Sequence, residues 1–311
     1  MPAKTKQPPD PQAKPSFARR SLLAATLLVV VASIGFGLVP LFARTLTNSG
    51  MAPSAIAFSR YLLTALLLLP FLALNRGSLA ATGWGLLAGI AAGFGWIVFF
   101  DALQVLPVST AGLLYMTYPV FTLLIVWLWL RETPQTRAVA AAGLILLAAA
   151  CVITPAATGD PSLKAYLLTL AAPLTFGFSI AVLTNKLNDL KPLSRIAAVS
   201  LGAMLGLLPM VGSLESAAFW PATAQAWWAV AGIALATALL PQLLYVIYAP
   251  QIGASKTAMA GSVELPTMLA ISWLLFGEAV TAWEVVACTI IFSAVLITPP
   301  PRTQTDGAPE G

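Results

Sequence analysis

Ten apolar runs divide this chain, and their length constrains the fold more than any other feature. Each is about 20 residues long, the length that an α-helix needs to cross a bilayer, and is bounded by Gly, Pro or charged residues. Of the 311 residues, 59% are hydrophobic and 9% are charged, whereas soluble domains carry about 25% charged residues. The sequence therefore predicts an all-α polytopic membrane protein with ten transmembrane helices.

The predicted spans form two groups of five. The first group covers residues 21–43, 53–74, 83–105, 110–131 and 138–154, and the second covers 163–183, 194–213, 225–247, 254–276 and 282–298. The proline-rich, basic residues 1–20 and the final residues 299–311 predict disordered tails. The first run is too long for the apolar part of a cleaved signal peptide, so we expect it to be retained. The chain divides into a first repeat at 21–155 and a second at 156–298.

The two groups repeat one another in sequence. Residues 108–130 align without gaps on residues 255–277, a shift of 147 that pairs Pro119 with Pro266. A second match, between the first and sixth spans, pairs Phe36-Gly37 with Phe176-Gly177. Because five crossings leave the chain on the other side of the membrane, the second repeat must enter from the opposite face, and the sequence predicts an inverted pair of repeats.

The positions of lysine and arginine test this topology. With the N-terminus inside, thirteen basic residues lie on the cytoplasmic side, only Arg44 and Lys164 lie outside, and Arg60 falls within the second span. The thirteen are Lys4, Lys6, Lys14, Arg19, Arg20, Arg76, Arg131, Arg137, Lys186, Lys191, Arg195, Lys256 and Arg302. This bias follows the positive-inside rule. We expect a multi-pass inner-membrane protein with both termini in the cytoplasm.

Three segments carry a family resemblance. They are Phe58-Ser59-Arg60-Tyr61, then Ala111-Gly112-Leu113-Leu114-Tyr115 leading to Tyr118-Pro119, and finally Arg131-Glu132-Thr133 with its echo Phe276-Gly277-Glu278. With them the chain, from about Leu22 to Thr298, resembles EamA-type transporters of the drug/metabolite transporter superfamily. The resemblance implies a basket of helices around a central cavity that works by alternating access. Similar members export amino acids, aromatic ones included, and other metabolites, whereas relatives move nucleotide sugars and sugar phosphates.

Glu264 is a lone carboxylate inside the ninth predicted span. An ionisable group there costs about 2.5–3.5 kcal/mol on insertion scales, so it usually faces a cavity or a partner. Gly261, Ser262 and Pro266 weaken the helix around it and free backbone carbonyls. The pattern predicts a substrate or proton site, with a structural carboxylate as the alternative. The first repeat has Thr117 at the matching position, so the charge is asymmetric.

Aromatic residues in other spans are further candidates for a substrate site. Tyr115 and Tyr118 in the fourth span can offer hydroxyls and ring faces to a cargo, and their alternative is an interfacial belt. Trp96, which follows small residues in the third span, can line the cavity or serve helix packing. The repeat-related Phe36 and Phe176 allow the same two interpretations.

Polar residues in the eighth and second spans complete the set of candidates. Gln242, Tyr245 and Tyr248 are spaced by three, which puts them on one helix face and predicts a water-lined wall. Arg60 can snorkel outward or pair with an acid such as Asp101, and we expect a structural role for it.

Proline, glycine and glutamate mark the expected hinges and helix ends. Pro119 and Pro266, together with Gly261, predict helices that bend during alternating access. Glu132 and Glu278 stand just before the fifth and tenth spans, where a carboxylate complements a helix N-terminus. We expect both to be capping residues.

The sequence lacks the residues that several classes of function require. The chain has no histidine, and Cys151 and Cys288 lie apart in apolar runs, so we expect no metal site, disulfide or cofactor. The scattered acids argue against the alternative of a polytopic membrane enzyme. The sequence has no GxxxxGK[ST] loop for a nucleotide, and the dispersed basic residues do not suggest a nucleic-acid partner. Transport would then be facilitated or proton-coupled, with Glu264 as the proton carrier.

The expected partners are the lipid bilayer and a small-molecule substrate. Ring-rich walls with one acid suit an amino acid with an apolar side chain, so we expect a secondary transporter that exports amino acids. A cationic drug, a sugar phosphate or a nucleotide sugar is the alternative cargo, and the oligomeric state stays open.

Overall fold

The computed structural model describes residues 15–131, 133–152, 163–252, 257 and 260–297. Every secondary-structure element in these ranges is helical, which confirms the predicted all-α class. The first half holds α1 (Pro15–Gly37), α2 (Val39–Asn48), α3 (Pro53–Leu68), the 3-10 helix η1 (Leu69–Phe71), α4 (Leu79–Val105), α5 (Val108–Tyr115), α6 (Tyr118–Leu130) and α7 (Thr136–Val152).

The described elements of the second half are also helical. They are α8 (Leu163–Thr169), α9 (Ala171–Asn185), α10 (Pro192–Gly212), α11 (Ser216–Phe219), α12 (Ala224–Ala234), the π-helix η2 (Leu235–Leu239), α13 (Leu240–Ile252), α15 (Glu264–Phe276) and α16 (Ala282–Ile297). α1 begins at Pro15, earlier than the sequence predicts, so residues 15–20 are helical and do not belong to a disordered tail.

Seven helical stretches in the described residues are long and apolar enough to cross a membrane. Three further apolar helices are shorter, at Thr136–Cys151, Glu264–Phe276 and Ala282–Ile297. Large apolar side chains such as Leu128 and Trp228 face outward, as expected of helices that contact lipid. The protein is a multi-pass membrane protein.

Several of these helices are broken partway along. α5 ends at Tyr115, and α6 begins at Tyr118 with Pro119 in its first turn. In the second half a turn at residues 262–263 precedes α15, whose first turn contains Pro266. Proline is tolerated at these positions because the first turn of a helix has no partner for its N–H group. The interruptions predicted next to Pro119 and Pro266 are therefore present.

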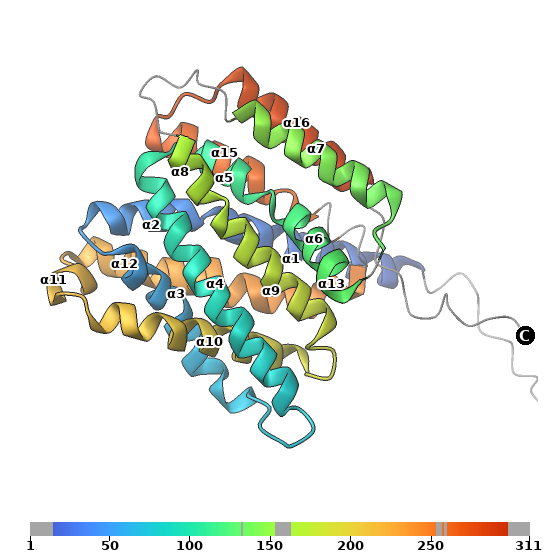
Figure 1. Ribbon diagram of the computed structural model, residues 1–311, viewed down its shortest axis with the longest axis horizontal. Helices are drawn as coiled ribbons and strands as arrows, with labels where there is room; N and C mark the ends of the chain where they lie inside the picture. The colour runs from blue at the N-terminus through green and yellow to red at the C-terminus, as the bar shows by residue number, and fades with distance from the viewer. Residues whose placement is uncertain (1–14, 132, 153–162, 253–256, 258–259, 298–311) are drawn as a thin grey trace, which may run out of the picture.

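Close contacts at glycines hold the bundle together. α4 packs along α10 on one side and α9 on the other (Figure 1). A Cβ atom on Gly89 would collide with the backbone of Val199, and one on Gly202 with the backbone of Leu86. Small residues of this kind let membrane helices approach at backbone distance. α7 and α16 lie side by side along one edge of the molecule (Figure 1).

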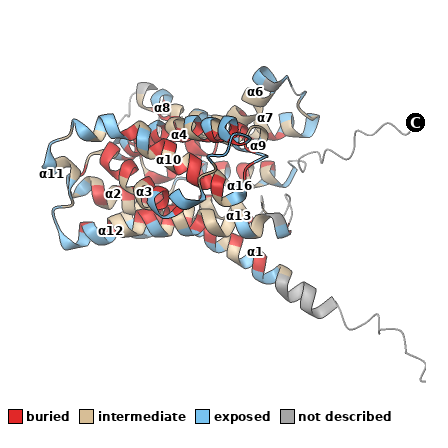
Figure 2. Cartoon of the chain, turned by 90° about the horizontal axis from the view of Figure 1, so that it is seen from below, coloured by how far each residue is buried: buried red, intermediate tan, exposed pale blue. Residues whose placement is uncertain are grey.

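The repeat-related glycines Gly37 and Gly177 make equivalent contacts. A Cβ atom on Gly37 would lie 2.8 Å from the Glu264 carbonyl oxygen, at the start of α15. One on Gly177 would lie 3.0 Å from the Tyr118 carbonyl oxygen, at the start of α6. α1 therefore packs on α15 as α9 packs on α6, which agrees with the sequence repeat. Buried residues concentrate in the middle of the bundle, where these helices meet (Figure 2).

We predict that Gly177→Ala lowers the melting temperature of the purified protein. The added methyl would lie 2.9 Å from the Phe121 Cβ and the Thr122 nitrogen, and such overpacking costs about 1–3 kcal/mol. Gly143→Ala on α7 is the control, because its Cβ would meet nothing within 4 Å and alanine favours helix by about 1 kcal/mol. Thermal unfolding in detergent compares the two variants. If Gly177→Ala melts at or above Gly143→Ala, the close α6–α9 contact is wrong.

Candidate functional site

A cluster of aromatic rings occupies the middle of the bundle. The Tyr115 ring lies 5.7 Å from the Trp96 ring, 5.8 Å from the Tyr118 ring and 5.3 Å from the Phe176 ring, measured between centroids. Tyr118 and Phe176 meet edge to face at 5.0 Å. Four helices, α4, α5, α6 and α9, thus bring together four residues that the sequence predicts for the substrate site. Aromatic pairs in these arrangements attract one another beyond their burial.

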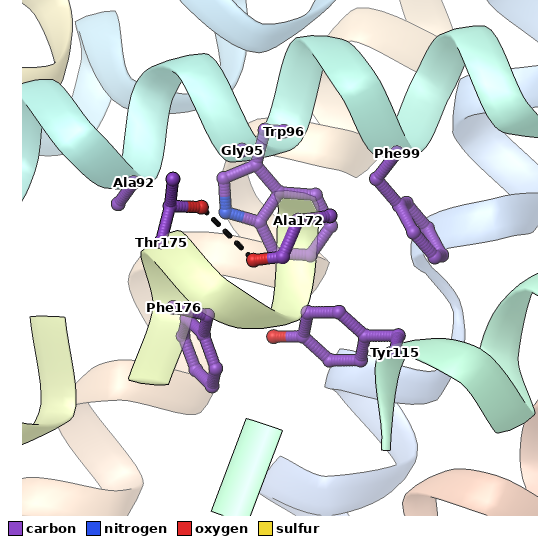
Figure 3. Close-up of a pocket in the computed structure, with 8 residues that line it drawn as sticks. All are labelled: Ala92, Gly95, Trp96, Phe99, Tyr115, Ala172, Thr175 and Phe176. Atoms are coloured by element: carbon purple, nitrogen blue, oxygen red, sulfur yellow. Dashed lines mark hydrogen bonds between the residues drawn. The ribbon is translucent and has the colours of Figure 1, made fainter. Parts of the chain in front are cut away.

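A narrow pocket lies beside these rings (Figure 3). Its walls are formed by the ring-bearing residues Trp96, Phe99, Tyr115 and Phe176 and by small residues from α4 and α9, among them Gly95 and Thr175. The Thr175 hydroxyl donates to the Ala172 carbonyl at 2.9 Å, so it is held within its own helix. With the side chains in these positions the pocket is too narrow for a water molecule.

Arg60, on α3, lies buried against this ring cluster. It is 2% exposed, and its guanidinium carbon lies 3.6 Å from the centroid of the Trp96 ring. Its Nη2 donates to the Thr237 carbonyl at 2.9 Å, whereas Nε and Nη1 have no hydrogen-bond partner. This corrects two expectations, because Arg60 neither snorkels outward nor pairs with Asp101. Asp101 is exposed and accepts a hydrogen bond from Gln104.

The partner of Arg60 is supplied by an irregular piece of helix. Thr237 lies in the π-helix η2, between α12 and α13. Single π-turns inside α-helices are rare and occur frequently at functional sites. The Thr237 hydroxyl donates back to the Ile233 carbonyl at 2.6 Å, and the residue is fully buried. The site thus combines a buried cation with a backbone distortion in the facing helix.

Glu264 begins α15 and is the acidic candidate of this site. Its side chain is partly buried, and α15 packs against α1 and α5. The one ion pair within 4 Å among the described residues is Arg44–Glu278, so Arg60 and Glu264 form no direct ion pair.

The remaining candidates form a second group at the α1–α13 contact. The Phe36 ring lies 5.7 Å from the Tyr245 ring, and Tyr245 and Tyr248 pack on an apolar cluster that includes Val29 and Ile252. This corrects the predicted water-lined wall, because two of its three members pack against α1. Gln242 is partly buried on the same helix.

The turn before α15 also adjoins this second group. A Cβ on Gly261 would lie 2.6 Å from the Tyr245 hydroxyl. Ser262 is partly buried in the turn itself.

Glu278 has a different role from the predicted cap of the tenth span. Its carboxylate accepts from the Val108 N–H at 2.8 Å, from the Ser272 hydroxyl and from the Arg44 guanidinium. It therefore caps α5, in the fourth span, and connects it to α2 and α15. The start of α16 is capped by Glu284, which accepts from the Thr281 N–H at 2.8 Å while its own N–H donates to the Thr281 hydroxyl, a capping box. Glu132 lies outside the described residues.

Three members of the buried centre are absent from the sequence-based site. Arg60 was assigned a structural role, and Phe99 and Phe100 were not singled out, although both rings lie within 5.5 Å of the Trp96 ring. The signal for Arg60 was available, because a second intramembrane charge is a natural counterpart to Glu264. Among the described residues, no group of three or more His, Cys, Asp or Glu side chains can hold a metal.

A multi-pass helical bundle with a buried, oppositely charged centre is the class of protein that these observations define. The profile described as the EamA-like transporter family matches residues 23–154 and 163–298. The chain therefore belongs to the EamA-like transporter family, whose members move small molecules across membranes. No curated protein matches the sequence.

A solved structure titled "Crystal structure of protein" is similar in fold. Its TM-score is 0.59 with 16% sequence identity, and the match covers 88% of this chain and 96% of that chain. At this identity the similarity supports the fold alone.

We predict that Glu278→Ala destabilises the protein, because it removes the acceptor of three donors on different helices. Leaving such groups without a partner costs about 1–3 kcal/mol. Glu278→Gln, which keeps one acceptor oxygen, should fall between wild type and Glu278→Ala. Glu215→Ala is the control, since Glu215 is exposed. Equal melting temperatures for the variants at positions 278 and 215 would contradict this account of the contact.

Proposed function

We propose that this protein is a secondary transporter that exports amino acids, aromatic ones among them, across the inner membrane. The observation that carries the proposal is the buried centre, where the basic Arg60 and the acidic Glu264 accompany a cluster of aromatic rings. A zwitterion with an apolar side chain complements both features. Polar groups fixed in a mostly apolar site are typical of small-molecule binding, and intramembrane charges are typical of transport pathways.

We propose ten transmembrane helices, arranged as inverted repeats at 21–155 and 156–298 with tails at either end. The seven long and three shorter apolar helices support this number. Contacts between helix ends support the proposed order of membrane crossings. Arg44 and Val108 both contact Glu278, and all three residues are outside in the proposed topology. Lys186 lies 5.4 Å from the Trp129 ring and 6.0 Å from the Trp84 ring, and these three are cytoplasmic in it.

Alternating access would use the interrupted helices as hinges. The breaks before Tyr118 and Glu264 lie at repeat-related positions, next to Pro119 and Pro266. Broken helices near a central site are a recurrent feature of secondary transporters built from inverted repeats. With the side chains as placed the narrow pocket has no room for a ligand, so entry of cargo would require its ring-bearing side chains or their helices to move. Gly261, just before the second break, would share in this movement.

We predict that Glu264→Gln weakens the transport of amine-bearing substrates and abolishes any pH dependence of flux. The amide keeps the shape of the side chain but removes the charge that an ammonium group contacts and the proton that a coupled cycle would carry. Flux of amino acids into proteoliposomes, with and without a pH gradient, measures both effects. The exposed Glu215→Gln is the control.

Two results would count against this role of Glu264. Wild-type flux and an unchanged pH profile in Glu264→Gln would make the residue structural. If the protein instead transports sugar phosphates or cationic drugs in the same proteoliposomes, the proposed cargo is wrong and the assignment as a transporter stands. A chemically changed product would point to an enzyme.

We also predict that an impermeant thiol reagent labels a cysteine at position 159 from outside the cell and leaves one at position 307 unlabelled. In the proposed topology the segment around Gly159 is external and the segment around Gly307 is cytoplasmic. Single cysteines would be introduced after Cys151 and Cys288 are replaced by alanine. External labelling at position 307 would contradict the proposed orientation.

A further inference from the structure

We infer that Arg60 binds the carboxylate of the cargo, so that this site selects substrates bearing a carboxylate and rejects those that carry an amine alone. The inference deepens the proposed transport function and rests on it. It assigns the carboxylate of the cargo to Arg60, because Glu264, itself an acid, can recognise only the amine. Three observations carry it: the free donors of Arg60, the fixed position of its guanidinium, and the absence of an ion pair with Glu264 within 4 Å.

Arg60 has hydrogen-bonding capacity that the protein does not use. Its side chain is 2% exposed, yet Nε and Nη1 have no partner. Nearly all buried polar groups in proteins are hydrogen-bonded, and a buried charge without its full set of partners is strongly disfavoured. An unsatisfied guanidinium in the centre of a transporter therefore indicates that the missing acceptor arrives with a ligand. Arginine presents its N–H groups in a planar fork that matches a carboxylate.

The guanidinium is also held in place before any ligand binds. Trp96 covers one face at 3.6 Å, and the Thr237 carbonyl accepts from Nη2 at 2.9 Å. These contacts come from α4 and from the π-helix η2, so two helices orient the α3 side chain. A group that is already oriented loses little conformational entropy when it binds. Trp96 lines the central pocket, which puts Arg60 next to the space where a cargo would sit.

The relation of Arg60 to Glu264 favours a zwitterion over a simple anion. The two residues form no ion pair within 4 Å. A purely structural pair would gain more from direct contact. A zwitterion would supply both missing partners, a carboxylate for Arg60 and an ammonium group for Glu264. A cationic drug would supply only the second of these groups.

A ligand series on wild-type protein tests the inference without any substitution. The probes are phenylalanine, phenylalaninamide and 2-phenylethylamine, which share one ring and one amine but differ in the carboxylate. We expect phenylalanine to inhibit amino-acid flux into proteoliposomes at a concentration about tenfold or more below the concentrations that the other two compounds need. The reason is that hydrogen bonds to charged groups contribute strongly to binding. Equal competition by all three would overturn the inference and leave amine transport intact.

Variants of Arg60 then separate a binding role from a structural one. Arg60→Met should weaken competition by phenylalanine about tenfold or more and leave that by 2-phenylethylamine unchanged or stronger. Arg60→Lys keeps the charge but loses the planar fork and should lie in between. Arg76→Met, at an exposed loop position, is the matched control. Equal losses for phenylalanine and 2-phenylethylamine would show that Arg60 only supports the fold.

The outcomes also distinguish this inference from the proposed function. If no probe competes and no amino acid is transported, the proposed function itself is wrong. If Arg60→Met fails to fold, the ligand series on wild-type protein and on Arg60→Lys still tests the inference, because each series compares ligands on one folded protein.

Discussion

The burial of two opposite charges in one membrane-spanning bundle is the constraint on which the rest of this structure depends. Arg60 is enclosed by the Trp96 ring and the Thr237 carbonyl, and Glu264 lies partly buried at the start of α15. Because Arg60 is 2% exposed, the neighbouring ring and backbone carbonyl must stabilise its charge. The aromatic cluster and the π-helix are the means by which the fold tolerates a charged centre.

The broken helices follow from the same constraint. A helix interruption exposes backbone groups that lipid cannot satisfy, so it is tolerated only inside the protein. α6 and α15 both begin within the bundle, where Gly177 and Gly37 bring α9 and α1 against their first turns. α1 and α9 thus pack in a similar way on α15 and α6. The repeats differ where Thr117 matches Glu264, so the acidic residue occurs in the second repeat alone at this position.

The features that could be predicted from the sequence are those that depend only on residues close together in the chain. Apolar length marks the helices, and proline chemistry marks the breaks next to Pro119 and Pro266, because neither depends on distant partners. Residue type nominated Trp96, Tyr115, Tyr118 and Phe176 one by one, each with an interfacial belt or helix packing as the alternative, and their role in a substrate site stays a prediction. The orientation of Arg60 and the α5 cap made by Glu278 depend on contacts 177 and 170 residues apart along the chain, which no local pattern encodes. For the same reason Tyr245 and Tyr248 were expected to face water and instead pack on α1.

Crystals of the protein grown with 4-bromophenylalanine would test the central claim most directly, since bromine gives an anomalous signal that locates the ring of the bound molecule. The account predicts one strong peak among Trp96, Tyr115 and Phe176, with density for the carboxylate within hydrogen-bonding distance of Arg60 and for the amine next to Glu264. A peak at a lipid-facing surface, or a ring in the centre with its carboxylate turned away from Arg60, would contradict it.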